Sequence, residues 1–248
     1  MSNRQTLFYK YHSLNNNLFK LLKHNAIWFS SRKDLNDLFE GRFTISEKYS
    51  MDALEEASEI FLAEMQAQLP LFYQFDSNRF FQIIYSTLKE KNLLSAFNSN
   101  FFYSETNFEW YVCCFTTKVD NNAMWAHYAD SNKGVCLEFD FSEDLKLLDK
   151  IHKVDYEEEM PVIETEDDLK KALLLKKKDW RYEDEWRILS ETGGSKKFKK
   201  ECLKAIYFGE RASKQDVRQV ISLCEEYGYS DIEFKRPYGQ SIKMRRIK

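Results

Sequence analysis

The chain has 248 residues, of which 43% are hydrophobic and 16% aromatic, enough apolar material to build a substantial core in one large domain or two small ones. Its net charge of −3 provides no overall basic field, so any contact with nucleic acid or an anionic membrane has to be local. The five cysteines are odd in number and lack C-x-x-C spacing, which predicts reduced thiols, a cytoplasmic protein and no structural zinc site.

The first residues, Met1 to Tyr9, lack the apolar stretch of a signal peptide, and no run of eighteen apolar residues occurs. We therefore expect neither export nor a membrane span. Seven glycines and three prolines argue against a Gly-rich phosphate loop, a classical dinucleotide fold and a Pro-rich linker. The tail from Lys243 to Lys248 is locally basic.

The amino-terminal part reads as a compact β-α-β opening, with a strand at 7–11, a helix at 15–24 and a strand at 26–30. Two amphipathic helical runs follow at about 51–69 and 77–94. We interpret them as a helical insertion, at about 45–105, in a single domain that spans residues 1–248.

From residue 111 the pattern changes to short apolar or alternating segments, which are typical of strands. The expected strands are 111–115, 134–140, 153–156, 182–189, 205–208 and 232–234, and the expected helices are 123–128, 167–178 and 214–226. The predicted fold class is α+β, with a mixed sheet and flanking helices.

Ionisable and bulky residues alternate between Trp180 and Ile188. Read with the period of a strand, Glu183, Glu185 and Arg187 point to one side. Two carboxylates on one face repel each other unless they are solvated, bound to a cation or held by Arg187, and such crowding is one way in which enzymes tune an acid or a base. The same letters also fit a helical turn with a Glu183–Arg187 ion pair, although the Gly-Gly pair that follows favours the strand.

A second candidate site lies at the end of the first strand, where Lys10, Tyr11 and His12 precede a serine. Unpaired backbone groups beside polar side chains can hold an amide or a phosphate. The alternative is an ordinary strand end with surface residues.

A third candidate site joins Thr116 and Thr117 to the helix that carries Trp125, His127 and Tyr128. Aromatic faces can clamp a flat ring, and the two hydroxyls can orient a ligand. The alternative is that Trp125 and Tyr128 belong to the core and that His127 donates to a carbonyl.

Three further segments are most simply structural. Asn36-Asp37, followed by Phe39-Glu40, is typical of a turn or a helix cap. The acidic run 157–159 and the basic run 176–178 are expected to be solvated faces.

Several motifs together resemble a large bacterial family of unknown function that is often found in mobile defence islands. They are Tyr9-Lys10-Tyr11, Leu35-Asn36-Asp37-Leu38-Phe39-Glu40, Cys114-Phe115-Thr116, Met124-Trp125-Ala126-His127-Tyr128, Lys133-Gly134-Val135, Trp180-x-Tyr182-Glu183-x-Glu185-x-Arg187 and Tyr207-Phe208-Gly209. That family in turn resembles a divergent branch of the ADP-ribosyltransferase superfamily. The resemblance implies a split, mixed sheet.

The same resemblance implies roles for individual residues, with NAD as the substrate and no metal. Glu185 matches the late catalytic glutamate, and Glu183 matches the second acid two residues before it. The residues matched to NAD binding are Lys10, Tyr11 and His12 on the first strand, Thr116 and Thr117 as the hydroxyl motif, Trp125, His127 and Tyr128 as the aromatic helix, and Arg187 beside the acids. The chain departs from the superfamily pattern on its first strand, where Lys10 takes the aligned place and His12 follows two residues later.

The leading hypothesis is an intracellular toxin or anti-phage defence effector that transfers ADP-ribose from NAD to a protein, RNA or DNA, with an antitoxin as a further partner and no membrane contact. One alternative is a metal-dependent nuclease that uses Asp155, Glu183 and Glu185 with a lysine from 176–178. The other is a non-catalytic module whose helical insertion binds a partner.

Overall fold

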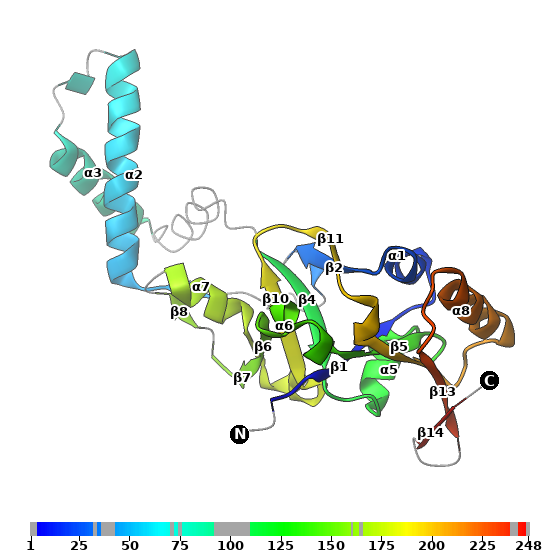
Figure 1. Ribbon diagram of the computed structural model, residues 1–248. Helices are drawn as coiled ribbons and strands as arrows, with labels where there is room; N and C mark the ends of the chain where they lie inside the picture. The colour runs from blue at the N-terminus through cyan, green and yellow to red at the C-terminus, as the bar shows by residue number, and fades with distance from the viewer. Residues whose placement is uncertain are drawn as a thin grey trace. The chain divides into compact units, whose positions relative to one another are not determined.

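The computed structural model describes residues 4–31, 34–35, 43–69, 72–73, 76–91, 110–159, 161–163, 166–238 and 243–246 (Figure 1). The chain divides into two compact units. The first comprises Met1–Leu38, Glu109–Tyr156 and Lys176–Lys248, and the second comprises Phe39–Phe108 and Glu157–Leu175. The expected insertion at about 45–105 falls within the second unit, and its last part, 92–105, lies outside the described residues.

A mixed sheet of ten strands, counted over the described residues, organises the first unit. Its main path runs β11, β2, β4, β1, β5, β12, β13 and β14, with the bounds Gly194–Lys197, Ala26–Ser31, Tyr111–Thr116, Leu7–His12, Val135–Asp140, Leu203–Phe208, Glu233–Tyr238 and Lys243–Arg246. Off this path, β10 (Glu185–Ser190) pairs with β4 and with β6 (Ile151–Lys153). The pairs are antiparallel except β12 and β13, which run parallel and are connected through helix α8 (Lys214–Glu226).

The sheet forks at β4, because β1 and β2 share one of its edges. β1 pairs with β4 only at Tyr9 and Thr116, whereas β2 pairs with β4 at Val112 and Tyr111. In the gap between these two contacts, the ammonium of Lys10 donates to the carbonyl oxygen of Cys114 at 3.0 Å. Lys10 therefore supplies a donor to β4 where the ladder with β1 has stopped.

Helices cover both faces of the sheet. On one face α1 (Asn16–His24) and α8 lie side by side over the larger apolar core (Figure 1), and the hydroxyl of Tyr229 donates to the carbonyl oxygen of Leu22 at 3.0 Å. On the opposite face α5 (Asn122–Tyr128) packs Met124 and Trp125 against Tyr9, Tyr11 and Tyr207. These positions follow the apolar stripe of each helix.

Side-chain caps determine where the helices of the first unit begin. Asn15 accepts from the backbone N–H groups of the first turn of α1, and Asn121 does the same for α5. Ser213 caps α8 in the same way. Each cap satisfies N–H groups that have no partner inside the helix and contributes about 1 kcal/mol.

Short elements complete the first unit. They are η3 (Phe141–Glu143), α6 (Leu145–Leu148), η4 (Lys178–Glu183), η5 (Lys200–Cys202) and the paired strands β7 (Asp155–Glu157) and β9 (Leu175–Lys177). Of these two strands, Glu157 and Leu175 are counted with the second unit. All five cysteines lie in the described part of the chain and are free, and four of them are buried.

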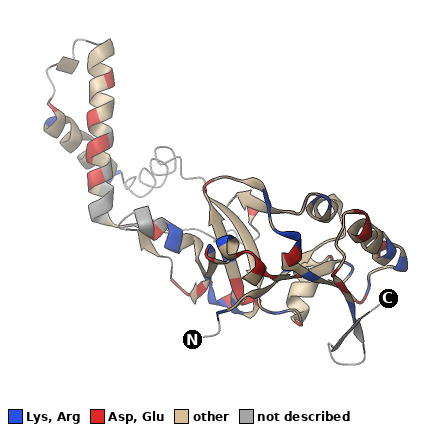
Figure 2. Ribbon diagram, viewed as in Figure 1, with Lys and Arg blue, Asp and Glu red and all other residues tan. Residues whose placement is uncertain are grey.

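The second unit contains α2 (Glu47–Gln68) and α3 (Ser77–Glu90), with α7 (Glu166–Leu173) and the parallel pair of β3 (Thr44–Ile45) and β8 (Val162–Ile163). In α2 the buried residues recur every fourth position, at Leu54, Ser58 and Leu62. The ring of Phe61 stacks on that of Phe80 in α3, with centroids 6.0 Å apart. Figure 2 shows red acidic bands along α2.

The predicted α+β class is confirmed, and the helix at 214–226 has the predicted bounds. The predicted helix at 167–178 is wrong in its second half, because residues 175–177 form β9. The predicted strand at 153–156 is two strands, β6 and β7, which the buried residue Val154 separates. No helix in the described ranges is both long and apolar enough to cross a membrane.

Gly134 stands where the chain enters β5 from α5. A Cβ atom at this position would lie 2.2 Å from the carbonyl oxygen of His12 and 2.9 Å from that of Ala129, and both are backbone atoms that cannot swing away. We predict that Gly134→Ala lowers the free energy of unfolding by about 2–3 kcal/mol, measured by urea denaturation.

Gly194→Ala is the matched control. Gly194 has a positive φ of 86°, but a Cβ atom added there would have no other atom within 4 Å. Its expected cost is only the backbone strain of about 1–2 kcal/mol. If the two variants lose the same free energy of unfolding, a steric clash at Gly134 is not the cause.

Candidate functional site

The two glutamates come from a turn followed by a strand. Residues 178–183 form the 3-10 helix η4, Asp184 adopts a left-handed conformation with φ 44°, and β10 begins at Glu185. The predicted strand at 182–189 is therefore wrong for Tyr182 and Glu183 and right from Glu185 onward. The left-handed residue reverses the local path, so Glu183 reaches Glu185 through a turn and not through strand alternation.

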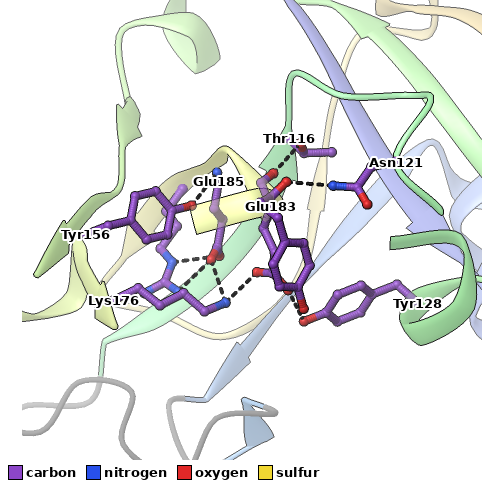
Figure 3. A network of polar contacts seen from close by, with 9 residues as sticks. Thr116, Asn121, Tyr128, Tyr156, Lys176, Glu183 and Glu185 are labelled. Carbon is purple, nitrogen blue, oxygen red and sulfur yellow. Dashed lines mark hydrogen bonds and ion pairs between the residues drawn. The ribbon is translucent and has the colours of Figure 1, made fainter. Parts of the chain in front are cut away.

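Both carboxylates bind the same ammonium group (Figure 3). Nζ of Lys176 donates to Oε2 of Glu183 at 2.6 Å and to Oε2 of Glu185 at 2.9 Å. Arg187 donates from Nε to Oε1 of Glu185 at 2.8 Å and from Nη2 to Oε2 at 3.0 Å. This acid–lysine network, defined as Lys176, Glu183, Glu185 and Arg187, contains two anions and two cations.

The network is almost completely buried. The exposed fraction is 2% for Glu183, 5% for Glu185, 7% for Lys176 and 0% for Arg187. Burial alone lowers the pKa of Lys176, but the charges of Glu185 and Glu183 raise it more, so its pKa lies above the ordinary value and the ammonium stays charged. Burial raises the pKa of Glu185, and the charge of Lys176 opposes that rise.

The end of β4 and the start of α5 hold the turn at 182–184. Thr116 Oγ1 donates to the carbonyl oxygen of Glu183 at 2.5 Å, and the Thr117 hydroxyl donates to the Asp184 carboxylate. The side-chain amide of Asn121 donates to the carbonyl oxygen of Tyr182 at 2.6 Å.

One further contact reaches the network itself. The hydroxyl of Tyr128 in α5 donates to Oε1 of Glu183 at 2.7 Å (Figure 3). Thr116, Thr117 and Tyr128, which the sequence singles out, are thus brought to the acids and their turn by direct hydrogen bonds.

β7 and β9 bring in two further residues. Sequence reasoning missed Tyr156, and it placed a lysine from 176–178 beside the acids only in the nuclease alternative. Lys176 lies in β9, and the ring of Trp180 covers its ammonium at 4.9 Å. The hydroxyl of Tyr156 in β7 accepts the backbone N–H of Glu185 at 2.8 Å. The expectation that 176–178 is a solvated face is wrong for Lys176, because an isolated basic run does not reveal which lysine meets a buried acid.

The first-strand candidates are divided between the two faces of the sheet. Tyr9 pairs with Thr116 and Thr116 pairs with Glu185, so Tyr9 and Tyr11 share the face of the acids. Lys10 and His12 therefore belong to the opposite face, where the Lys10 ammonium lies 5.4 Å from the centre of the Phe115 ring. The structure does not bring Lys10 or His12 to the acids.

The remaining candidates occupy different environments. Trp125 is 2% exposed and donates from Nε1 to the carbonyl oxygen of Val119 at 2.8 Å, as the core alternative expects. His127 is exposed. Tyr11 is buried and donates to the carbonyl oxygen of Lys118 at 2.9 Å. The candidate motif at 36–40 lies outside the described residues.

No metal site accompanies the acids in the described ranges, since nowhere in them do three His, Cys, Asp or Glu side chains gather closely enough to hold an ion. Asp155, which the nuclease alternative requires, is exposed on β7.

The sequence also did not identify Asn121 as a residue near the site. Its position directly before an apolar helix is a recognisable cap signal.

Comparison with known proteins bears on this same region. Residues 124–188 match the family model described as "Protein of unknown function (DUF2971)". The matched segment includes Tyr128, Tyr156, Lys176 and both glutamates. No curated protein and no solved structure matches the chain.

Removing the shared cation should destabilise the fold. We predict that Lys176→Met lowers the free energy of unfolding by about 3–5 kcal/mol, because it leaves two buried carboxylates with one fewer cation. The measurement is urea denaturation at pH 7. Asp149→Asn, which removes the exposed ion pair of Arg4 and Asp149, should cost under about 1 kcal/mol. A cost for Lys176→Met as small as that of the control would contradict the network's importance.

His12 should make stability depend on pH. Its Nε2 atom is buried without a hydrogen-bond partner, and burial, with Lys10 nearby, lowers its pKa from 6.5 to about 3. Below pH 6.5 the unfolded chain binds a proton that the folded chain excludes, so the free energy of unfolding falls as the pH falls toward 3. Relative to His12→Leu, the wild type should lose about 1–2 kcal/mol between pH 7 and pH 5. Parallel pH profiles for the two proteins would refute this.

Proposed function

We propose that the chain is an ADP-ribosyltransferase that uses NAD as substrate and Glu185 and Glu183 as its catalytic acids. The observation that carries the proposal is the pair of carboxylates on one ammonium, beside the hydroxyl of Tyr128. The motif resemblance adds a cellular setting, since the family it points to is found in mobile defence islands. We accordingly propose a toxin or anti-phage defence effector.

The proposed reaction breaks the bond between nicotinamide and ribose. Nicotinamide leaves with the bonding electron pair, and positive charge develops on the ribose. A carboxylate near the ribose 2′-hydroxyl stabilises that charge, and the gain is largest where water is excluded. We assign this role to Glu185, which Arg187 and Lys176 hold in one orientation.

Glu183 is suited to a different step. Its carboxylate accepts one hydrogen bond from Tyr128 and one from Lys176, whereas a carboxylate can accept about four. We propose that Glu183 takes the proton of the incoming nucleophile as the new bond to the ribose forms. The acceptor is a protein, an RNA or a DNA, and Tyr128 supplies an aromatic ring beside the reacting groups.

A non-catalytic binding module is the second candidate, and two observations favour it. The acids are 2% and 5% exposed, and N–H or O–H groups of the protein itself already bind all four of their oxygens. In the second unit, apolar side chains of Ile60, Phe61, Leu69, Tyr73 and Ile83 are exposed, as on a surface that receives another protein. An antitoxin is a partner of this kind.

Two charge-balanced double variants separate these candidates. Lys176→Met with Glu185→Gln and Lys176→Met with Glu183→Gln each remove one cation and one anion, so they leave the buried network with the same net charge. We expect the first to release nicotinamide from NAD at least about 100-fold more slowly than wild type. The second keeps Glu185 and its contacts with Arg187, so it should release nicotinamide faster than the first while losing transfer to an acceptor.

The assay incubates each purified protein with labelled NAD and a bacterial lysate, and follows the label into separate protein, RNA and DNA fractions. Thermal unfolding of the same samples shows that the variants are folded. Label that enters one fraction only with wild type supports the transferase and gives the class of acceptor. Folded wild type that neither releases nicotinamide nor transfers label would refute the proposal and favour the binding module.

A further inference from the structure

Positive charge is concentrated at one end of this acidic chain. Residues 235–248 contain six Lys or Arg and no Asp or Glu, so the other 234 residues carry a formal charge of −9 within the total of −3. Five of the six cations stand in β13 and β14, at Lys235, Arg236, Lys243, Arg245 and Arg246. We call these two strands the basic ribbon. In Figure 2, β13 passes from a red to a blue stretch.

The register of the basic ribbon places like charges opposite each other. Lys235 pairs with Arg246, and Arg236 pairs with Arg245, in consecutive antiparallel positions. Like charges directly opposite on neighbouring strands destabilise a sheet. A polyanion bound along the ribbon removes that repulsion, because one phosphate can lie near two cations.

Protection of a sheet edge accounts for only part of this charge. β14 ends the path of strands, and charged residues on an edge strand do prevent unwanted pairing between chains. β13 is not an edge strand, since it pairs with both β12 and β14. Edge protection also gives no reason for acidic residues to be missing from the whole segment after Glu233.

The ribbon interleaves an aromatic residue with its cations. Because positions alternate between the two faces of a strand, the positions of Arg236, Tyr238, Lys243 and Arg245 share one face of the ribbon. Aromatic rings among Lys and Arg are typical of surfaces that bind single-stranded nucleic acid, where unpaired bases stack on the rings. Segments that bind a membrane surface instead combine cations with a broad apolar face.

We propose that the basic ribbon binds single-stranded nucleic acid through its phosphates, with base stacking on Tyr238. This inference does not depend on the reaction proposed above, and it is tested without NAD. Full-length protein is titrated into a fluorescently labelled 20-nucleotide single strand, and anisotropy is followed from 50 to 200 mM salt. Lys235 is ion-paired with Glu233 at 2.9 Å and Arg236 donates to the carbonyl oxygen of Ala212, so we expect the phosphate contacts to come from Lys243, Arg245 and Arg246. Three phosphate contacts predict that affinity falls about 20-fold over that range.

The ribbon variant combines Lys243→Gln, Arg245→Gln and Arg246→Gln. Its matched control combines Lys146→Gln, Lys150→Gln and Lys197→Gln, three exposed lysines outside the ribbon whose removal changes the net charge equally. At 50 mM salt we expect the ribbon variant to bind at least about 30-fold more weakly than wild type, with a salt slope smaller by about 2. The control should change by less than about threefold.

Tyr238→Leu provides a second variant that leaves every charge in place. It should weaken binding of the single strand about tenfold without changing the salt slope. The proposal is overturned if wild type does not bind at 50 mM salt, if the control loses as much affinity as the ribbon variant, or if duplex binds as tightly as the single strand. Binding to vesicles of anionic lipid without binding to the oligonucleotide would also overturn it.

Discussion

The ammonium of Lys176 between two buried carboxylates is the interaction on which the first unit of this protein depends. Taking four charged groups out of water costs several kcal/mol for each ion, and only close contacts among them offset that cost. Here every contact within the network lies between 2.6 and 3.0 Å. The positions of β9, of the turn at 184 and of β10 are therefore coupled, because a shift in any of them leaves a charge buried alone.

Both faces of the sheet carry a buried apolar cluster, and the acids lie on the face of the smaller one. The other face carries the large core under α1 and α8. The acids lie opposite that core. On their face, cross-strand pairing sets Glu185, Thr116, Tyr9 and Glu138 in one row across β10, β4, β1 and β5. Glu138 accepts a hydrogen bond from the hydroxyl of Tyr207 at 2.5 Å. A further carboxylate with buried aromatic neighbours therefore lies three strands from Glu185.

Charge is distributed unevenly, and the two proposals use different parts of that distribution. The buried network has equal numbers of cations and anions, as expected where an unbalanced charge would be expelled or neutralised. The basic ribbon carries five cations and lies in a chain that is otherwise strongly acidic. The family match covers the segment 124–188 and so includes the acids but not the ribbon.

The sequence by itself determined the α+β class, the two runs of α2 and α3, the bounds of α8 and the shared face of Glu185 and Arg187. These features depend on local periodicity, caps and charge spacing, which neighbouring letters record. Only the tertiary structure decided that Asp184 breaks the strand, that Lys176 joins the two acids and that Lys10 and His12 belong to the other face. Each of these depends on which distant segments meet. Thr116, Thr117 and Asn121 hold the turn at 182–184 from more than 60 residues away, and pairing through β4 sets which side of β1 faces the acids. Sequence periodicity identifies the two faces of a strand, but pairing with its neighbours decides which of them meets the site.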